Sequence, residues 1–491
     1  MGLKKQIPMN ILVASKIERA DLLIVPFVQT ADFSDRLTRM ASKIGISSAE
    51  LSASFKGEKK ETFLVATPQR KISKTLLLGL GKSPDSAQII QTFRSLFQSQ
   101  KNKWSGSIAV DLKSMAEKAE YVVNGIMLAT YELGMLKTDN KESTNVFTNG
   151  SELSILVNAS QQEKVEASVK RGQLTAETQM NMMALVDAPS NYKTPQMMAD
   201  YVVKSGKEHG FEVTVFDEVQ CEEKGFHALL AVGRGSVDRP ARMAVMEYKG
   251  GEKKVGFVGK GVTFDTGGVS LKPGDGMQDM KMDMGGSAAV IGAVELAAKL
   301  KLPYHVIGIV AFTENCIDAL AIKPGDVIQS YAGKTIEVIN TDAEGRLILA
   351  DAIHYMVTEF KPEMMIDLAT LTGSCIRTLG HVSAGLMTNS GALAASIEKA
   401  GLQTGEKVWR LPLTDDYKDE LNSDVADIKN LGGAYAGATT AGKFLEYFTN
   451  EHPNWAHLDI AGTAFMKSEF SKSGSATAYG VRLLREVLES Y

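Results

Sequence analysis

Hydrophobic and polar residues alternate along this chain with two periods, one typical of strands and one typical of helices. In the first 150 or so residues, short apolar runs are separated by longer segments in which apolar residues recur at helical spacing. The predicted strands are 21–28, 74–81, 106–112 and 153–158, and the predicted helical segments are 34–45 and 113–136. This alternation predicts a small α/β domain.

A long, glycine-poor helical stretch follows at residues 160–187, and the breaker-rich segment PSNYKTP (189–195) comes after it. Thr194 and Pro195 are a good N-cap and first-turn pair for another helix. We therefore place an N-terminal domain at residues 1–160, a linker helix at 161–190 and a larger C-terminal domain at 191–491.

The remaining sequence alternates strands and helices more regularly. Several strands are apolar nearly throughout, as strands covered on both faces are. Strands are predicted at 211–217, 242–248, 254–259, 304–312, 335–339, 363–369 and 455–461, with helices at 286–300, 346–359, 391–403 and 436–449. The predicted fold class is α/β, with a smaller N-terminal domain joined by a long helix to a larger domain that has a central mixed sheet.

Composition narrows the classes of protein. Hydrophobic residues make up 44% of the 491 residues and the net charge is −4, which argues for a globular protein and against a strongly basic nucleic-acid binder. The three cysteines are far apart and form no CxxC motif, which is typical of a reducing compartment. Charged residues break every apolar run in residues 1–25, so we expect no signal peptide, no membrane association and a cytoplasmic location.

Charged residues interrupt the apolar C-terminal region in two stretches, each directly after a predicted strand. Ligands bind outside the carboxyl ends of strands in open α/β sheets, so we expect the two stretches to meet in one crevice. The first stretch, 258–286, contains Lys260, Asp265, Lys272 and Asp283, and the second, INTDAEGRLILADA (339–352), contains Asp342, Glu344 and Arg346.

Four carboxylates that converge need cations, because an unpaired buried charge costs several kcal/mol, roughly. Hard dications prefer carboxylate oxygens, and two dications would balance the four carboxylates. This balance of charge predicts a two-metal hydrolytic centre, in which ions about 3.5–4 Å apart bind a water and a substrate oxygen.

Each feature taken alone has a more ordinary interpretation. An Asp-x-Glu turn is usually a helix cap or a solvated loop, and the methionines of MQDMKMDM (277–284) are typical of core filler. The segment GKGVTFDTGG (259–268) lacks both common nucleotide-binding patterns, and the seven histidines form no HExxH motif. Only the combination of these features, in one domain and directly after strands, favours a metal site.

Five motifs in the C-terminal region resemble those of the leucyl (cytosol) aminopeptidase family. The resemblance covers this region nearly end to end, whereas the N-terminal region is similar only in length and α/β character. The motifs are NTDAEGRL (340–347), Lys260-x4-Asp265-x6-Lys272-x10-Asp283, ATLTG (369–373), SDVADIKN (423–430) and WAHLDIAG (455–462).

The resemblance implies an aminopeptidase that releases N-terminal residues, leucine and other apolar residues preferred, by attack of a metal-bridging water on the peptide carbonyl. It implies Lys272 and Arg346 as catalytic side chains, with bicarbonate held by Arg346. It also implies two Mn²⁺ or Zn²⁺ ions per subunit, bridged by two of their ligands, Asp265 and Glu344. The implied metal ligands are Lys260, Asp265, Asp283, Asp342 and Glu344.

The resemblance also implies a pocket for the first substrate side chain, peptide substrates with a free N-terminus, and a homohexamer. Leu371 would lie near the anion, and Ala464 stands where some relatives carry a bulkier methionine. The implied pocket residues are Met280, Thr370, Gly373, Ala461 and Ala464. Two alternatives remain: a DNA-binding or regulatory role, for which no basic arm is seen, and another two-metal hydrolase such as a phosphoesterase.

Overall fold

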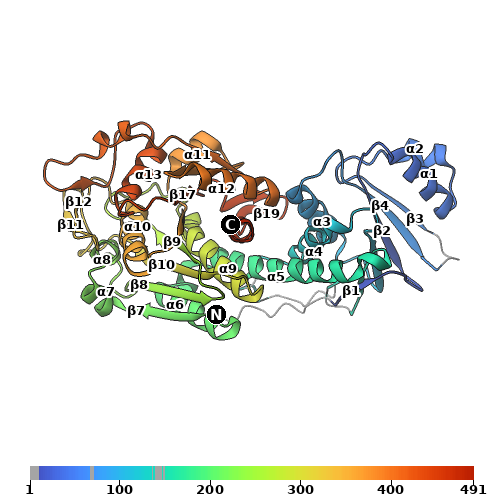
Figure 1. Ribbon diagram of the computed structural model, residues 1–491, viewed down its shortest axis with the longest axis horizontal. Coiled ribbons are helices and arrows are strands. Elements are labelled where there is room, and N and C mark those ends of the chain that lie inside the picture. Colours follow the sequence, from blue (N-terminus) through green and yellow to red (C-terminus); the bar gives the residue numbers. More distant parts are fainter. Residues whose placement is uncertain (1–9, 67–70, 135, 139–145, 148–149) are drawn as a thin grey trace. The chain divides into compact units, whose positions relative to one another are not determined.

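The computed structural model describes residues 10–66, 71–134, 136–138, 146–147 and 150–491, and the chain forms two compact units, residues 2–177 and 178–491 (Figure 1). The chain passes from one unit to the other within α5 (Gln162–Asp187). The predicted fold class, a smaller and a larger α/β unit with a mixed sheet in the larger one, is confirmed. Residues 1–9, on which the expectation about a signal peptide partly depends, lie outside the described residues.

The N-terminal unit contains a six-stranded sheet in the order β1-β6-β5-β2-β4-β3, parallel except for β3. The strands are β1 (Ile11–Ala14), β2 (Leu22–Phe27), β3 (Thr62–Ala66), β4 (Lys74–Gly79), β5 (Ser107–Asp111) and β6 (Glu152–Leu156). The helices are α1 (Phe33–Ile44), α2 (Ser48–Ser54), α3 (Ser86–Gln100) and α4 (Ala119–Leu128), with 3₁₀ turns η1 (Ala116–Lys118) and η2 (Ala159–Gln161). The helix predicted over 113–136 is therefore shorter than expected.

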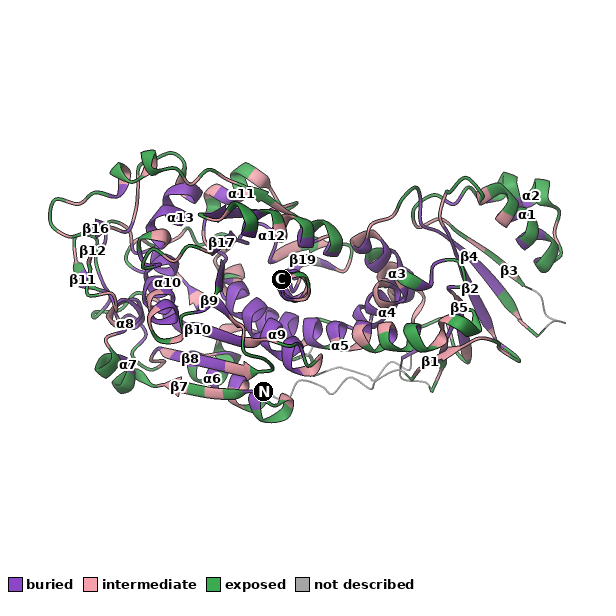
Figure 2. Ribbon diagram, viewed as in Figure 1, coloured by how far each residue is buried: buried purple, intermediate pink, exposed green. Residues whose placement is uncertain are grey.

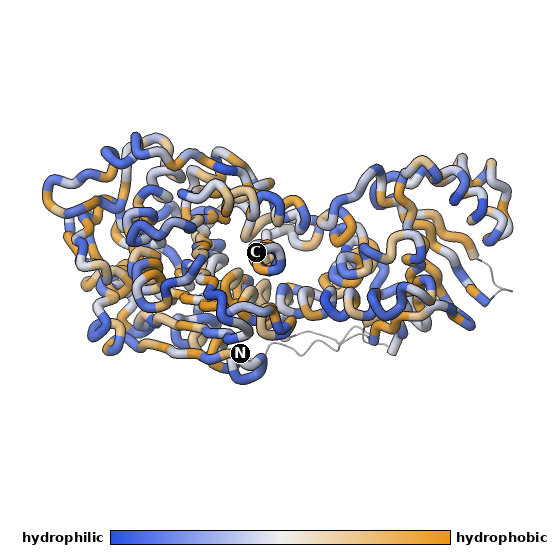
Figure 3. Tube along the Cα trace, viewed as in Figure 1, coloured by the Kyte–Doolittle hydropathy of each residue, from blue (hydrophilic) through white to orange (hydrophobic). Residues whose placement is uncertain are grey.

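The C-terminal unit is built on an eight-stranded sheet in the order β15-β14-β17-β13-β9-β10-β8-β7. Parallel and antiparallel pairs alternate irregularly across it, so the sheet is mixed. The strands are β7 (Glu212–Phe216), β8 (Arg242–Lys249), β9 (Lys254–Asp265), β10 (His305–Asn315), β13 (Met364–Ala369), β14 (Ala384–Thr388), β15 (Val408–Arg410) and β17 (Trp455–Asp459). Hydrophobic positions are dense along strands of both units (Figure 3).

Helices and short turns complete the C-terminal unit. The helices are α6 (Pro195–His209), α7 (Glu218–Lys224), α8 (His227–Gly233), α9 (Gly285–Lys299), α10 (Glu344–Tyr355), α11 (Gly373–Leu379), α12 (Gly391–Thr404), α13 (Gly437–Tyr447) and α14 (Val481–Ser490). Short elements are η3 (Ser190–Tyr192), η4 (Met277–Met282), η5 (Met356–Phe360), η6 (Asp415–Tyr417) and η7 (Asp419–Leu421). The smaller sheets are β11 (Val327–Gln329), β12 (Thr335–Glu337) and β16 (Ile428–Lys429), and the pair β18 (Phe465–Ser468) and β19 (Ser471–Ala476).

The helix α9 is buried along almost its whole length, as its apolar sequence predicts (Figure 2). Small residues let it approach the sheet closely. A Cβ atom at Gly259 of β9 would lie 2.7 Å from Ser287 Cα, and one at Gly286 would lie 2.0 Å from the Leu368 carbonyl oxygen. Substitution at either glycine would therefore push α9 off the sheet.

Two features of the central region differ from the sequence-based expectation. The strand predicted at 254–259 continues to Asp265, because β10 pairs with it as far as Asn315 and the buried Thr263 hydroxyl donates to the Thr313 carbonyl. The strand near 335–339 belongs to the small β11-β12-β16 sheet and not to the central sheet. The turn at 340–344 therefore follows a strand of another sheet, although it still reaches the end of β9.

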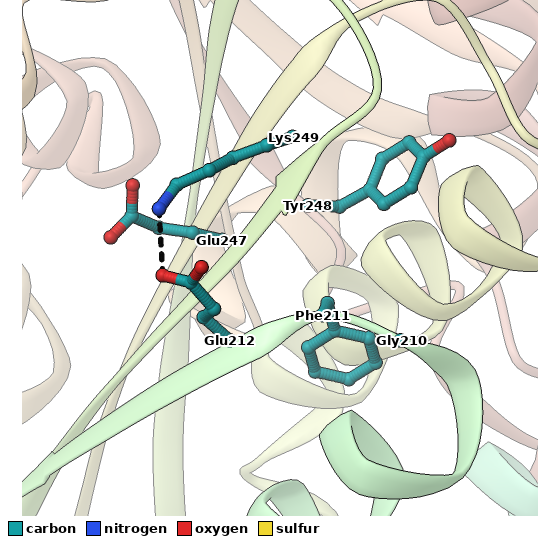
Figure 4. Close-up of a pocket in the computed structure, with 6 residues that line it drawn as sticks. All are labelled: Gly210, Phe211, Glu212, Glu247, Tyr248 and Lys249. Carbon is teal, nitrogen blue, oxygen red and sulfur yellow. Dashed lines mark hydrogen bonds and ion pairs between the residues drawn. The ribbon is translucent and has the colours of Figure 1, made fainter.

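A pocket of about 280 Å³ lies beside the edge strand β7 and its neighbour β8 (Figure 4). Its lining includes Glu247 and Lys249, which pair with Ile307 and His305 at the amino end of β10, whereas Asp265 pairs with Asn315 at the carboxyl end. This pocket is therefore at the opposite end of β10 from the acidic stretches.

Candidate metal centre and active site

The two acidic stretches meet at the carboxyl end of β9. Lys260 and Asp265 are on that strand, Asp283 follows η4, Asp342 lies in the turn before α10, and Glu344 is the first residue of α10. Together with Lys272, these residues form what we call the carboxylate cluster, whose members are Lys260, Asp265, Lys272, Asp283, Asp342 and Glu344. The predicted convergence of the two stretches is observed.

Ion pairs connect the members of the carboxylate cluster. The Lys260 Nζ atom is 2.7 Å from Asp283 Oδ2 and 2.7 Å from Glu344 Oε1. The Lys272 Nζ atom is 2.7 Å from Asp265 Oδ2 and also contacts Asp342 Oδ1. The two lysines therefore bind different pairs of carboxylates.

The cluster is buried on one side and open on the other. The side chains of Lys260, Asp265 and Glu344 are at most 3% exposed, whereas those of Lys272 and Asp342 are 20% and 33% exposed. One carboxylate oxygen from each of Asp265, Asp342 and Glu344 lies within 4.8 Å of the others. A ligand from solvent would therefore approach along Lys272 and Asp342.

Neighbouring polar side chains fix the orientation of the carboxylates. The amide of Asn315 donates to Asp265 Oδ1 (2.8 Å) and to the Thr341 carbonyl (3.0 Å). The Thr370 hydroxyl donates to Asp283 Oδ1 at 2.7 Å. The sequence analysis did not identify Asn315, although its position at the end of a strand beside the cluster is consistent with such a role.

Asn430 holds the acidic turn from the other side. Its Oδ1 accepts a hydrogen bond from the Ile339 N–H at 2.8 Å, and its Nδ2 donates to the Asn340 carbonyl at 2.8 Å. Asn430 is the last residue of the SDVADIKN motif, and no local pattern singled it out. Glycine is also required nearby, because a Cβ atom at Gly345 would lie 2.7 Å from the Lys260 ammonium.

A buried lysine outside the motifs supports the segment before Asp283. Lys193 is 1% exposed, and its ammonium donates to the carbonyls of Leu185 and Val186 at the end of α5 and to the Lys281 carbonyl in η4. In turn, the Lys281 ammonium donates to the Asp187 carbonyl at 3.0 Å. These bonds join η4 to the end of α5, and no sequence signal predicted them.

The crowded charges shift the pKa values of the cluster. Burial alone would lower the pKa of Lys260, but the carboxylates of Asp283 and Glu344 outweigh it and raise the pKa. Burial, reinforced by Asp265, raises the pKa of Glu344 to about 8 despite Lys260. Burial also raises the pKa of Asp283 to about 6, with Lys260 opposing it. In this buried site, the ionised carboxylates of Asp283 and Glu344 are therefore costly without more positive charge than Lys260 supplies.

The donor set fits divalent cations. The four carboxylates outnumber the two ammoniums, which leaves a charge of −2 when all six groups are ionised. Glu344 Oε2 is buried and accepts no hydrogen bond from any residue that the structure describes. A buried carboxylate oxygen without a donor is costly, and a hard cation is a suitable partner for it.

Arg346, the third residue of α10, is 5% exposed. Its Nη1 donates to the Asn430 carbonyl at 2.9 Å, while its buried Nε finds no acceptor among the described residues. Burial lowers the pKa of Arg346 to about 10, and Glu344 and Asp459 oppose this shift. The guanidinium stays charged at neutral pH and retains a free donor for an anion.

Three of the five expected pocket residues, Thr370, Ala461 and Ala464, lie beside the start of α9 or beside Asp459, and Leu371, expected near the anion, also contacts Asp459. A Cβ atom at Gly285 would touch both Ala464 Cβ (2.9 Å) and Thr370 Cγ2 (3.2 Å), so these two residues lie beside the start of α9. The N–H groups of Leu371 and Ala461 each donate to Asp459 Oδ1 at 3.2 Å. The other two pocket residues are Met280, in η4, and Gly373, the first residue of α11.

An α/β sheet with acidic residues gathered at the end of a strand, in a form that suits divalent cations, fits the class of metal-dependent hydrolases. Residues 181–485 match the cytosol aminopeptidase family, catalytic domain, and residues 24–140 match the N-terminal domain of the same family. The chain belongs to the cytosol aminopeptidase family, as the sequence motifs predicted. It is therefore an aminopeptidase, a hydrolase of peptide bonds.

Individual relatives agree with this assignment. The chain is 41% identical to a probable cytosol aminopeptidase of Chloroherpeton thalassium, over 94% of this chain and 96% of the relative. It is 42% identical to one from Chlorobaculum tepidum, over 86% and 87% of the two chains.

Solved structures are also similar. A mutant of tomato leucine aminopeptidase is 30% identical, with a TM-score of 0.87 over 100% of this chain and 98% of that one. A bottromycin maturation enzyme in complex with Mn is 28% identical, with a TM-score of 0.83 over 96% and 99%.

Proposed function

We propose that this aminopeptidase releases N-terminal residues from peptides with a free N-terminus, leucine and other apolar residues preferred. The observation that carries the proposal is the carboxylate cluster, with its surplus negative charge and its buried, donor-free Glu344 oxygen. With divalent ions bound there, the free α-amine of a substrate would ligate one of them, and an internal peptide has no such amine.

We assign two divalent ions, Mn²⁺ or Zn²⁺, to the cluster. Asp265, Asp342 and Glu344 would hold them, since one carboxylate oxygen from each residue lies within 4.8 Å of the other two. The whole ligand set is Lys260, Asp265, Asp283, Asp342 and Glu344. When bound, such ions supply an acidified water and polarise the peptide carbonyl. Lys260 would ligate through a neutral nitrogen, because an ammonium has no lone pair for a metal and the adjacent dications would favour loss of its proton.

Lys272 and Arg346 are the proposed catalytic side chains. The Lys272 ammonium is on the open side of the cluster, where it would stabilise the negative charge that develops on the scissile carbonyl oxygen. Arg346 would hold a bicarbonate ion through its free Nε and planar fork, with Leu371 nearby. An anion held there would supply proton-transfer chemistry beside the reacting groups.

The first substrate side chain would enter the space beside Asp283, lined by small and apolar groups. Thr370 and Ala464 adjoin the start of α9 there, and Ala464 leaves more room than a methionine would. We therefore expect a tolerance for large apolar side chains. The proposed pocket residues are Met280, Thr370, Gly373, Ala461 and Ala464.

The proposal includes a cytoplasmic homohexamer without a nucleic-acid partner. The names of the relatives support the cytoplasm, and the net charge of −4 gives no support for nucleic-acid binding. Among the described residues, no helix has the length and apolar character needed to span a bilayer.

A metal count combined with a substrate comparison tests this function. Freshly purified protein should contain close to two divalent ions per chain, hydrolyse leucyl amide, and lose that activity on chelation and regain it with Mn²⁺. An N-acetylated leucyl amide is the matched control and should not be cleaved. Cleavage of a phosphomonoester in place of leucyl amide would contradict the proposal and favour a two-metal phosphoesterase.

A further inference from the structure

The N-terminal unit contains a pocket that the proposed peptidase chemistry does not use. It has a volume of about 180 Å³ and lies at the carboxyl ends of the neighbouring parallel strands β2 and β5. Its lining comes from these two strands, from α1, and from the residues directly after β5. The lining residues are Val25, Phe27, Arg36, Arg39, Met40, Lys43, Asp111, Lys113 and Ser114.

The topology makes this position a natural ligand crevice. From β2 the chain goes on to β3 and β4 on one side, whereas from β5 it goes on to β6 on the other side. The two strands are hydrogen-bonded neighbours, so the connections diverge directly above them. In open α/β sheets, ligands bind where connections diverge in this way.

The charges at the pocket are predominantly positive. Arg36, Arg39 and Lys43 recur at helical spacing on one face of α1, and Lys113 approaches from the segment after β5. Asp111 is the one carboxylate of the described lining. Within the described chain, neither Arg39 nor Lys113 forms an ion pair with a carboxylate, so both remain available to an anion.

Arg36 is held in place at the pocket wall. Its guanidinium carbon lies 4.9 Å from the centre of the Phe27 ring, and its Nη2 donates to the Ser114 hydroxyl at 2.9 Å and the Pro26 carbonyl at 3.3 Å. A fixed guanidinium loses little entropy when it binds a phosphate oxygen. The floor of the pocket is apolar and is made of Val25, Phe27 and Met40.

We propose that this pocket binds a small organic phosphate of the nucleoside monophosphate type. The phosphoryl group contacts Arg36, Arg39 and Lys113, and the planar part rests on the apolar floor, with Asp111 as an acceptor for a hydroxyl or amino group. The volume is below the ~300 Å³ of pockets that enclose drug-sized ligands, so part of the ligand extends into solvent. A compact pocket of this kind favours a small molecule over a nucleic-acid strand, which needs an extended basic track.

Calorimetric titration of the full-length protein at about 0.15 M salt tests the proposal, since screening at that concentration removes weak non-specific attraction. Adenosine monophosphate should bind one site per chain with a dissociation constant below about 1 mM. Adenosine should not bind, and inorganic phosphate should bind more weakly. Absence of binding by the monophosphate, or equally tight binding of inorganic phosphate, overturns the proposal.

Charge reversal locates the site. The exposed pair Arg39→Glu and Lys113→Glu should weaken binding by at least about tenfold, because each removes a charge-assisted contact. Lys82→Glu, an exposed reversal outside the pocket lining, is the matched control and should bind normally. Unchanged affinity in the double variant refutes the site. Binding of a single-stranded oligonucleotide but not of the monophosphate overturns the proposal in favour of a nucleic-acid surface.

Discussion

Two groups of buried charge in the C-terminal unit differ in how completely their polar atoms are paired. The first is the carboxylate cluster. The second surrounds Glu295 of α9, whose Oε1 accepts hydrogen bonds from Tyr201 (3.1 Å) and Ser205 (2.6 Å). Its Oε2 pairs with Lys299 at 3.5 Å, and that ammonium also donates to Thr178 at 2.9 Å.

The difference in pairing distinguishes a charged group that only stabilises the fold from one that can bind a ligand. Both oxygens of Glu295 have partners and one ammonium matches the one carboxylate, so the Glu295 group joins α6 and α9 and needs nothing further. In the carboxylate cluster, negative charge is in excess and Glu344 Oε2 has no donor in the described chain. A buried polar group that the fold leaves incomplete is available to complete its bonding with a cation.

The strongest test of this comparison is the same substitution in both groups. Glu344→Gln removes a bridging carboxylate, so metal content should fall and activity should drop by more than ~10³-fold, beyond the loss of a single oxyanion donor. Glu295→Gln should keep both metal and kcat, but should lower the free energy of unfolding by about 1–3 kcal/mol because Lys299 loses its ion-pair partner. Elemental analysis, kinetics and urea denaturation measure the three quantities.

Two results would contradict the interpretation. Unchanged metal stoichiometry in Glu344→Gln would remove that carboxylate from the metal site. Loss of metal in Glu295→Gln would mean that the apparently complete group also supports the site, and the contrast between them would fail.

Lys272→Ala tests the lysine on the open side of the cluster. Its ammonium should stabilise developing charge, so kcat should fall by ~10²–10³, the cost of one oxyanion donor. Metal content should stay near two ions, since Lys272 is not a proposed ligand. A variant with the full rate would exclude Lys272 from the mechanism.

Arg346→Ala should have a smaller effect, because the residue holds a proton carrier and no metal. We expect kcat to fall by roughly 10²-fold, within the range of a lost acid-base contribution, with both ions retained. Added bicarbonate should stimulate the unmodified enzyme but not the variant. Loss of metal from this variant would instead show that Arg346 is structural, acting through its bond to the Asn430 carbonyl.

Much of the fold could be predicted because its signals are local. The apolar run of α9 and the Thr194–Pro195 start of α6 appear in the structure as expected, with the Thr194 hydroxyl accepting from the Met197 N–H at 3.4 Å. The end of β9 was misjudged because Lys260 and Asp265 look like loop residues, and their burial depends on partners far along the chain.

The charged residues of the candidate site could be predicted from composition and motifs. Carboxylates in two stretches indicated a cation site, and family motifs indicated which residues to expect. The supporting groups could not be found in the same way. Lys193, Asn315 and Asn430 act through bonds to backbone carbonyls and N–H groups across 88, 26 and 90 residues of sequence separation, respectively, which no local pattern records.

The smallest expected effect concerns Asp351 of α10, a buried carboxylate that, among the residues the structure describes, accepts hydrogen bonds from backbone donors alone. Its two oxygens accept from the N–H groups of Leu229 (3.0 Å) and Tyr331 (2.8 Å). Burial nevertheless raises the pKa of Asp351 to about 7, against these bonds. The folded protein therefore binds a proton that the unfolded chain, with the pKa near its ordinary 3.8, releases.

Asp351 should consequently favour folding least at high pH. Its contribution to the free energy of unfolding declines as pH rises from about 4 to 7, whereas Asp351→Asn has no proton to lose. We compare the melting temperatures of the variant and the unmodified protein at pH 5 and at pH 7.5. From the lower to the higher pH, the difference should change in favour of the variant by at least about 2 °C, the shift expected for roughly 1 kcal/mol. Exposed Asp416→Asn is the control and should show no such gain. A constant difference across this range would mean that backbone donors alone complete a buried carboxylate, and that Asp351 stays ionised in the folded protein.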